Sequence, residues 1–171
     1  MPASQKPVAP KVDAFQPHDH RRCRATAMAE VRARCEQEKL RLTPARESVL
    51  NALLETHRAM TAYELLDRLR DDGLPHQPPV AYRALDFLVE HGFAHRIERL
   101  SAFVACTHGS DHHAAAFLVC RGCRTVAESK LPAPIRGIEE TMSRESFTVE
   151  RLVVEAEGLC AACAEAGTET P

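Results

Sequence analysis

The sequence predicts an α+β protein, with an N-terminal winged helix-turn-helix domain followed by a small C-terminal α/β domain. Three observations predict this fold class. Apolar residues recur at helical spacing through residues 22–92, two short strand-like runs follow in residues 93–107, and from Ala115 the pattern becomes mostly that of β-strands. Several helices followed by a hairpin are typical of a winged helix-turn-helix, whose last helix enters the DNA major groove while the hairpin forms the wing. A small helical bundle remains the alternative for the first half.

The first two helices are predicted on either side of Thr43. Residues 22–40 are rich in Ala, Glu and Arg, with apolar side chains near helical spacing. Thr43 can cap a second helix, and Pro44 suits its first position because no backbone N–H is needed there. The apolar stripe of this second helix consists of Val49, Leu50, Leu53 and Leu54.

Capping residues and glycines delimit the third and fourth helices. Thr61 and Glu64 fit a capping box, and Asp72-Gly73 ends the third helix. The fourth helix follows Pro78-Pro79 and stops at His91-Gly92. Its apolar residues at helical spacing are Ala81, Ala84, Leu85 and Leu88.

Short strand-like runs predict the hairpin and the second domain. Residues 93–99 and 102–107 flank a tight polar turn. In the second half, strands are expected at 115–119, 125–127 and 148–157, with a helix at 134–143. The predicted organisation is a proline-rich disordered arm (1–20), the winged-helix domain (21–107), a hinge (108–113) and the α/β domain (114–171).

Length and composition exclude several classes of protein. A chain of 171 residues and 18.9 kDa accommodates one compact domain or two small ones. The longest apolar run, Ala114 to Cys120, is far shorter than a membrane span, and the first twenty residues hold four prolines and no apolar signal segment. We therefore expect a cytoplasmic protein with no membrane partner. Seven cysteines in a reducing compartment favour metal or redox chemistry over disulfides.

Charge is unevenly distributed, although the net charge is only −2. Residues 21–97 hold 13 basic and 11 acidic side chains, whereas residues 98–171 hold 7 and 11, so the first half is the better candidate for binding nucleic acid. Eighteen of the 22 basic residues are arginines, which suits bidentate recognition of phosphate or guanine. A GC-rich genome would produce the same arginine bias.

Two C-x-x-C pairs carry the sharpest chemical signal. Cys120-Arg121-Gly122-Cys123 and Cys160-Ala161-Ala162-Cys163 supply four thiolates, the full tetrahedral set of a closed structural zinc site. Zinc bound there would join the helix and strand that lie between the two pairs. Unconnected buried or redox-active cysteines are the alternative. Cys23 and Cys35 lack a partner at metal-ligand spacing, so we interpret them as helix-packing residues.

A second group of potential ligands surrounds the hinge. Each side chain alone would be ordinary on a solvated surface, but together they indicate a metal site that joins the two domains. Imidazole, thiolate and carboxylate suit Zn²⁺, and the thiolate disfavours Mn²⁺ and Mg²⁺. The group consists of His95, Cys106, His108, Asp111, His112, His113 and Glu128. His18 and His20 are a weaker candidate, because a flexible arm loses conformational entropy before it binds.

Several motifs resemble, in order and spacing, the ferric uptake regulator superfamily, most closely its zinc uptake regulator branch, over about residues 22–165. They are Leu42-Thr43-Pro44-Ala45-Arg46, Ala62-Tyr63-Glu64-Leu65-Leu66, Pro79-Val80-Ala81-Tyr82-Arg83-Ala84-Leu85, Cys120-x-x-Cys123 and Gly158-Leu159-Cys160-Ala161-Ala162-Cys163. The resemblance implies a homodimeric, zinc-responsive transcriptional repressor of zinc-uptake genes, with a C-terminal α/β dimerisation domain. It also implies that double-stranded operator DNA is the partner and that there is no small-molecule substrate.

The resemblance implies roles for individual residues and two zinc ions per chain. The structural zinc ligands would be Cys120, Cys123, Cys160 and Cys163, and the regulatory zinc ligands His95, Cys106, His113 and Glu128. Tyr63 and Arg83, with the adjacent Tyr82, would contact DNA. Regulatory zinc is expected to select the closed arrangement, in which all four ligands converge, and thereby to set the spacing of the two recognition helices.

The sequence departs from the superfamily in two places. Iron-type members carry a His-x-Asp-His cluster where this chain has residues 114–117, and no histidine follows His113. We therefore expect the additional C-terminal metal site to be absent and iron sensing to lack its usual ligands. Val80-Ala81 replaces the usual Ser or Thr that precedes Val-Tyr-Arg, so DNA affinity is expected to depend more on Arg83 and neighbouring basic residues.

Two alternative functions remain at this point. A manganese, iron or peroxide sensor on the same fold would share most of this pattern, and the thiol of Cys106 argues against it. A zinc enzyme would need an open coordination position and a base, and neither His-Glu-x-x-His nor His-x-Glu before Pro-Cys-x-x-Cys is present. We therefore expect no enzyme activity.

Overall fold

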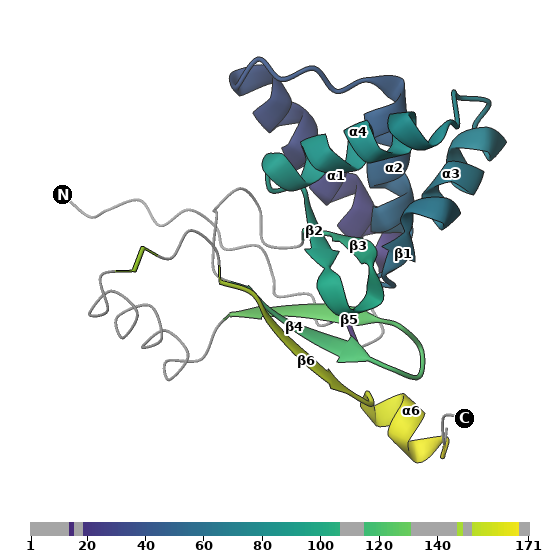
Figure 1. The fold of residues 1–171 in the computed structure, drawn as a ribbon, viewed down its shortest axis with the longest axis vertical. Coiled ribbons are helices and arrows are strands. Elements are labelled where there is room, and N and C mark those ends of the chain that lie inside the picture. The colour runs from purple at the N-terminus through teal and green to yellow at the C-terminus, as the bar shows by residue number, and fades with distance from the viewer. Residues whose placement is uncertain (1–13, 16–18, 107–114, 131–146, 149–151, 168–171) are drawn as a thin grey trace.

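The computed structural model describes residues 14–15, 19–106, 115–130, 147–148 and 152–167 of the 171. The helices within residues 20–90 gather at one end of the molecule, a β-hairpin lies below them, and a second sheet lies below the hairpin, followed by a short helix at the opposite end (Figure 1). This arrangement confirms the predicted α+β class, a winged helix followed by a smaller α/β part. The division into arm, hinge and domains at particular residues stays a prediction, because residues 107–114 and most of the arm lie outside the described ranges.

Four helices form the first part, each with a local sequence reason for its start. They are α1 (His20–Gln37), α2 (Pro44–Glu55), α3 (Ala62–Asp71) and α4 (Pro78–Glu90). The capping box of α3 is present as predicted: Glu64 N donates to Thr61 Oγ1 at 3.3 Å, and Thr61 N donates to Glu64 Oε2 at 2.7 Å. Helix α1 begins earlier than predicted, because the Asp19 carboxylate accepts from the first backbone N–H groups.

The helices enclose one apolar core. Leu50 and Leu53 of α2, Leu65 of α3 and Leu85 of α4 are at most 1% exposed and belong to one cluster of buried side chains. Cys35 of α1 is buried in the same cluster, which agrees with its interpretation as a packing residue. Because the apolar stripe of α4 faces this core, its opposite face is left for other contacts.

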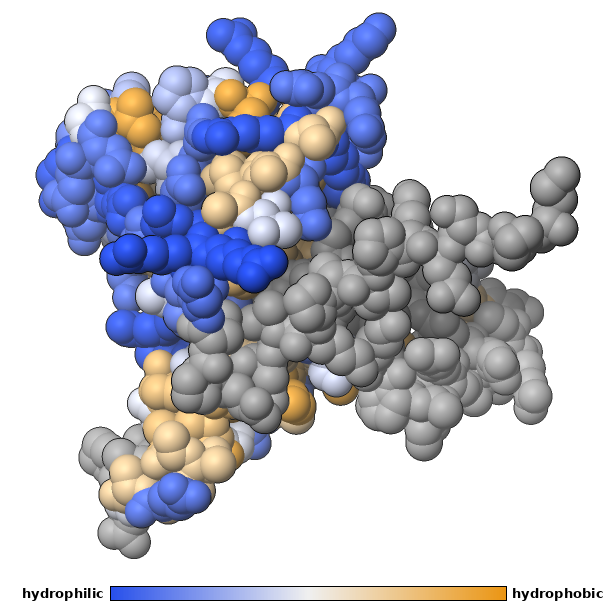
Figure 2. All heavy atoms as spheres, turned by 180° about the vertical axis from the view of Figure 1, so that it is seen from behind, coloured by the Kyte–Doolittle hydropathy of each residue, from blue (hydrophilic) through white to orange (hydrophobic). Residues whose placement is uncertain are grey.

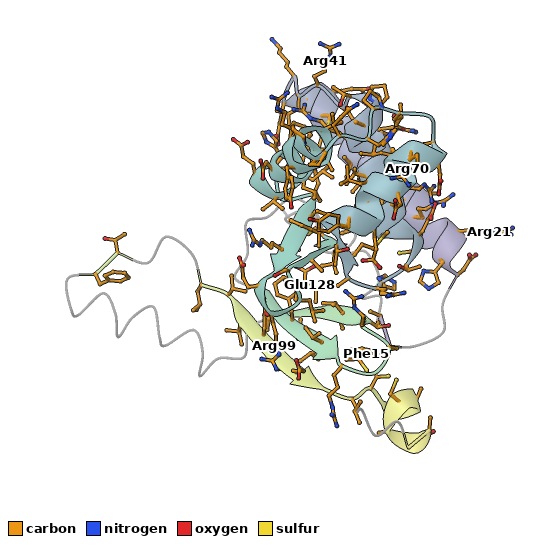
Figure 3. The ribbon with its side chains drawn as sticks, turned by 45° about the vertical axis from the view of Figure 1, so that its right-hand side comes forward. Phe15, Arg21, Arg41, Arg70, Arg99 and Glu128 are labelled. Carbon is orange, nitrogen blue, oxygen red and sulfur yellow. The ribbon has the colours of Figure 1, made fainter. Side chains whose placement is uncertain are left out.

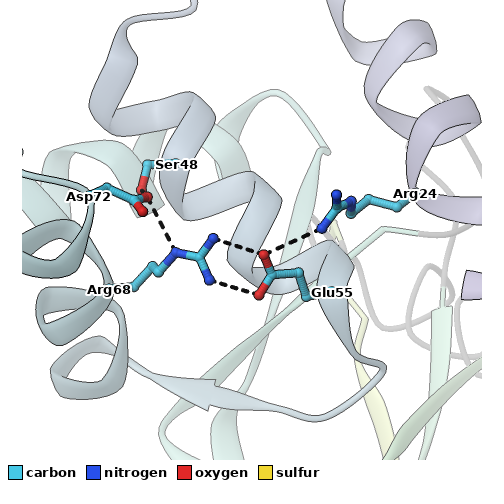
Figure 4. A network of polar contacts seen from close by, with 5 residues as sticks. All are labelled: Arg24, Ser48, Glu55, Arg68 and Asp72. Carbon is cyan, nitrogen blue, oxygen red and sulfur yellow. Dashed lines mark hydrogen bonds and ion pairs between the residues drawn. The ribbon is translucent and has the colours of Figure 1, made fainter. Parts of the chain in front are cut away.

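A polar network joins the first three helices beside this core (Figure 4). Arg68 of α3 donates to both oxygens of Glu55, at the end of α2, over 2.7 and 2.8 Å. Arg24 of α1 reaches the same carboxylate at 3.4 Å. Arg68 also pairs with Asp72, whose carboxylate accepts a 2.6 Å hydrogen bond from Ser48. The network therefore fixes how α3 lies against α2.

The wing is a three-stranded sheet rather than a simple hairpin. Strands β2 (Ala94–Ile97) and β3 (Ala102–Ala105) flank the short 3₁₀ helix η1 (Glu98–Leu100), and Ser101 closes the turn with a left-handed φ of 47°. Strand β1 (Met60–Thr61) pairs with the other edge of β3, giving the order β1-β3-β2. Sequence periodicity missed β1, because a two-residue strand depends on its partner rather than on a pattern of its own.

The second sheet has the order β5-β4-β6. Its strands are β4 (Ala115–Cys120), β5 (Val126–Lys130) and β6 (Val154–Gly158), and helix α6 (Ala161–Glu165) follows β6. Strand β4 is antiparallel to β5 and parallel to β6. Strand β6 begins later than the predicted residue 148, since residues 152 and 153 are outside any strand. The helix predicted at 134–143 lies outside the described residues.

The wing sheet packs on one face of the second sheet. Beside this contact, Ala59 N donates to Arg124 O at 3.1 Å and Val126 N donates to His57 O at 2.8 Å. Side chains from both parts form one buried apolar cluster, consisting of Ala59, Ile97, Ala102, Val104, Phe117, Val119 and Val126. This packing fixes where wing residues meet residues of the second sheet. Within the described ranges, none of the helices is both long and apolar enough to cross a membrane.

Candidate metal centres and nucleic-acid face

Two strand ends and one helix bring the four cysteines together. Cys120 ends β4 beside its parallel neighbour β6, Cys123 follows in the next turn, and Cys160 precedes α6, which contains Cys163. All four sulfurs lie within 4.8 Å of one another, and the Cys123 and Cys160 Sγ atoms are 3.9 Å apart. A tetrahedron of thiolates around zinc, with Zn–S bonds of about 2.3 Å, has S–S separations of about 3.8 Å. The spacing fits four ligands of one ion, and none of the four cysteines forms a disulfide.

The protonation chemistry of this cluster also suits a cation. Burial raises the pKa of the Cys120 thiol, but the backbone N–H groups of Cys123, Cys160 and Gly122 outweigh it and lower the pKa to about 6. The hydrogen bond with the Cys160 sulfur, together with burial and the other sulfurs, raises the pKa of Cys163 to about 12. The neighbouring sulfurs therefore disfavour the state in which all four thiols are deprotonated. A bound cation would stabilise the four thiolates.

Sequence reasoning missed the polar groups that orient these sulfurs. The Cys123 thiol donates to Thr125 Oγ1 at 3.2 Å, and Cys160 N donates to Cys120 Sγ at 3.3 Å. Such contacts hold ligands in place around a metal. The threonine two residues after the first C-x-x-C pair is a sequence signal that could have predicted the first contact. The contact from the Cys160 backbone depends on how β4 and β6 are paired, which local sequence does not specify.

A second cluster lies where the wing meets the second sheet. It consists of His95 on β2, Cys106 directly after β3, and Glu128 on β5, with one ligand atom of each within 4.8 Å of the others. His95 Nε2 is 3.2 Å from Glu128 Oε1, and the Glu128 side chain is only 4% exposed. Figure 3 shows the position of Glu128 beside the two sheets. The His95 ring also lies against Phe117, at 5.1 Å between centroids.

This donor set fits a zinc ion. Imidazole nitrogen, thiolate sulfur and carboxylate oxygen are all ligands that zinc takes, and a nearly buried carboxylate is stabilised by a cation beside it. Three of the four residues expected for the regulatory site are therefore brought together. The fourth, His113, lies outside the described residues, as do His108, Asp111 and His112.

Helix α4 presents the face expected to meet nucleic acid. Tyr82 and Arg83 are exposed, while Ala81, Ala84 and Leu85 on the opposite face are at most 2% exposed. Tyr63, in the first turn of α3, is 77% exposed. Strongly hydrophilic side chains gather over the helical part, in contrast to the alanine-rich α6 (Figure 2). The three residues expected to contact DNA are thus accessible.

These features define a winged-helix protein whose second part is built around a four-cysteine cluster and meets the wing at a mixed nitrogen, sulfur and oxygen cluster. The model of the ferric uptake regulator family matches residues 37–156. The chain belongs to this family, which confirms the resemblance that the motifs indicated.

Individual relatives narrow the comparison to the zinc branch. The chain is 39% identical over 144 residues to the zinc uptake regulation protein of Escherichia coli (strain K12), and the match covers 81% of each chain. A solved zinc uptake regulator complexed with zinc and DNA is 36% identical, with a TM-score of 0.78 over 84% of this chain and 96% of that one.

Two forms of another zinc uptake regulator differ in their similarity to this chain. Holo XcZur is 36% identical, with a TM-score of 0.72 over 86% of this chain and 99% of that one. Apo XcZur is 35% identical, with a TM-score of 0.50 over 84% of this chain and 99% of that one. Because identity and coverage barely differ between the two forms, the difference in TM-score reflects how the chain is arranged. The arrangement of this chain is more similar to that of the holo form.

Proposed function

We propose that this protein is a homodimeric, zinc-responsive transcriptional repressor of zinc-uptake genes and not an enzyme. The observation that carries the proposal is the convergence of His95, Cys106 and Glu128, contributed by the wing and by the second sheet. Each chain would hold one structural zinc at the four cysteines and one regulatory zinc at this convergence, with His113 as the fourth ligand.

The four-cysteine cluster has the features of a structural site. Its ligands come from the ends of β4 and β6 and from α6, so one ion would tie together segments 40 residues apart in sequence. Four protein sulfurs leave no position for a substrate or an activated water. This is consistent with a regulator and argues against catalytic zinc.

The mixed cluster has the features of a sensor. Its ligands lie on both sides of the contact between the wing and the second sheet, so they converge only when the two parts are packed as they are here. Zinc bound there would supply a cation shared by both sides. An ion that binds the packed arrangement better than any other shifts the population toward it. The greater similarity to the holo than to the apo regulator agrees with this interpretation.

The packed arrangement would control how α4 is presented to DNA. The dimer places two copies of α4 on one duplex, and only a fixed orientation of each wing domain gives the half-site spacing of about one DNA turn. Arg83 and Tyr82 on α4, with Tyr63 on α3, would then contact the DNA. Similarity to a regulator solved with zinc and DNA supports this role.

The test measures zinc content and DNA binding together. The full-length protein is expected to hold two zinc ions per chain, of which mild chelation removes one. Removal should abolish binding to a duplex from upstream of zinc-uptake genes, and zinc, rather than manganese or iron, should restore it. DNA binding that is insensitive to chelation, or restored better by manganese or iron, would contradict the proposal.

A further inference from the structure

The turn at the tip of the wing is held by a side chain from the second sheet. Backbone N–H groups of Glu98 and Arg99 donate to the two oxygens of Glu155 on β6, at 2.7 and 3.1 Å. These two residues open η1, whose own capping residue, Ile97, provides no side-chain hydrogen bond. The Glu155 carboxylate therefore does for this turn what a capping side chain does for a helix, although it lies 57 residues away in sequence.

A second carboxylate on the same strand holds the side chain of the turn. The guanidinium of Arg99 pairs with Glu157 through Nε, and its Nη2 donates to Glu157 Oε1 at 3.2 Å. Arg99 extends beside β6 (Figure 3). Because alternate residues of a strand share a face, Glu155 and Glu157 lie on the same side of β6. We call the contacts of these two carboxylates with residues 98 and 99 the wing clasp.

The wing clasp and the proposed regulatory site lie at opposite ends of one contact. His95 and Cys106 are at the base of the wing hairpin, whereas residues 98 and 99 are at its tip. Between them, Ile97 and Val104 of the wing pack with Phe117 and other residues of the second sheet. This apolar contact restrains the wing but is not directional, so polar attachment at both ends fixes the direction of the wing better than a ligand set at the base alone.

We propose that Glu155 and Glu157 are positioning residues for zinc-controlled DNA binding, and that they hold the wing tip in the orientation at which the regulatory ligands converge. This inference rests on the proposed function. The wing clasp and regulatory zinc stabilise the same arrangement, so each strengthens the other by thermodynamic linkage. Loss of the wing clasp should lower the affinity for regulatory zinc and leave zinc binding at the four-cysteine site unchanged.

The two carboxylates differ in expected effect. Glu155 makes two charge-assisted bonds to backbone groups that have a fixed geometry, while Glu157 pairs with an exposed, flexible arginine. Exposed ion pairs contribute little on average, whereas loss of a cap costs about 1 kcal/mol, or roughly fivefold in an equilibrium. Loss of Glu155 should therefore weaken zinc-dependent DNA binding more than loss of Glu157.

The experiment compares Glu155→Ala, Glu155→Gln and the control Glu165→Ala in the full-length protein. Glu165 is an exposed carboxylate on α6, so its removal changes the charge of the same domain by the same amount. Affinity for the removable zinc is measured by competition with a chromogenic chelator, and DNA binding by fluorescence anisotropy across a buffered zinc series.

We expect Glu155→Ala to need about five- to tenfold more free zinc for half-maximal DNA binding, with near-normal affinity at saturating zinc and an unchanged structural zinc content. Glu155→Gln should shift less, because its remaining oxygen still accepts one bond. The control should match the wild type.

A purely electrostatic effect of Glu155→Ala would change DNA affinity in the opposite direction, so the experiment distinguishes the two explanations. Removing a negative charge strengthens the attraction of a protein to DNA. If Glu155→Ala and Glu165→Ala tighten DNA binding equally, or if the zinc midpoint of Glu155→Ala stays within twofold of wild type, the wing clasp has no positioning role. If the wild type itself ignores zinc, the proposed function fails, and the clasp is then judged by whether Glu155→Ala alone weakens DNA binding.

Discussion

Cys106 is the side chain on which the metal preference of the mixed cluster depends. Its partners His95 and Glu128 offer nitrogen and oxygen, which manganese and iron also accept. Among these three ligands, only the Cys106 thiol favours a softer ion such as zinc. A half-buried cysteine directly after β3 could instead be a packing residue, and the two roles predict different results on substitution.

Cys106→Ser should separate sensing from folding. We expect a folded dimer that keeps one zinc per chain, while half-maximal DNA binding moves to at least tenfold higher free zinc, because a hydroxyl is a poor substitute for a thiolate. Anisotropy on an operator duplex across buffered zinc measures the shift. Cys23→Ser, at a half-buried cysteine of α1 outside both clusters, is the matched control. A wild-type midpoint for Cys106→Ser would remove this residue from the sensor and favour manganese or iron.

Arg83 is expected to read a base, because its exposed side chain takes no part in the buried core of the helices. It lies on the exposed face of α4, opposite the buried residues of that helix. Arg83→Ala should cost about 1–3 kcal/mol on the operator and little on random DNA, because a bidentate contact to guanine carries sequence information. Tyr63→Phe should act in the same direction but more weakly. Arg21→Ala on α1 serves as the charge-matched control, and an equal loss on both duplexes would make Arg83 a phosphate contact.

At the scale of elements, the proposed DNA-contacting residues lie on α3 and α4, so the orientation of these helices against α2 would decide which side chains reach DNA. Apolar packing holds α4 on one side, and the Arg68 network holds α3 on the other. The hydrogen bond from Ser48 and the pairing with Arg68 lower the pKa of Asp72. The ionised carboxylate therefore stabilises the folded state above its unfolded pKa, and this contribution is lost as the pH falls through the lowered value.

Removing the centre of this network should destabilise the helical part. Arg68→Ala leaves Asp72 without a guanidinium and leaves Glu55 only its longer 3.4 Å contact with Arg24. About two thirds of each of these two carboxylate side chains is buried. We expect a loss of about 1–2 kcal/mol in the free energy of unfolding, measured in urea at pH 7. Arg70→Ala, which breaks an exposed pair with Asp67, should cost under about 0.5 kcal/mol. Equal effects would show that the Arg68 network contributes no more than a surface pair.

At the scale of the whole molecule, the sequence predicted those features that depend on residues close together in the chain. The α3 capping box, the Thr43 cap and Pro44 start of α2, and the C-x-x-C pairs each lie within a few residues, and the structure places them as expected. Helix α4 begins at Pro78, two residues earlier than predicted, because its two prolines occupy the first helical positions, where no N–H is needed. The family resemblance supplied His95, Cys106 and Glu128, which local pattern alone left within a larger group. Strand β1 and the wing clasp escaped prediction, because both depend on partners more than 40 residues away.

The four-cysteine site should decide whether the second part of the molecule folds at all. The sheet β5-β4-β6 is small, and the cysteines sit at the ends of β4 and β6, where the ion would hold the parallel pair together. In small zinc modules the metal contributes on the order of 10 kcal/mol of folding free energy, comparable with the stability of a whole domain. Loss of one ligand should therefore be more than a local defect.

Cys120→Ser and Cys163→Ser are expected to lose the fold of this part and, with it, dimerisation. The helical core, built from residues 28–94, makes no use of the site and should keep its helical circular dichroism signal. Sedimentation velocity, zinc content and thermal unfolding measure the three consequences separately, and Cys23→Ser again controls for loss of a thiol. A Cys120→Ser or Cys163→Ser protein that stays dimeric, with its melting temperature and zinc content intact, would show that the four sulfurs do not hold a structural ion.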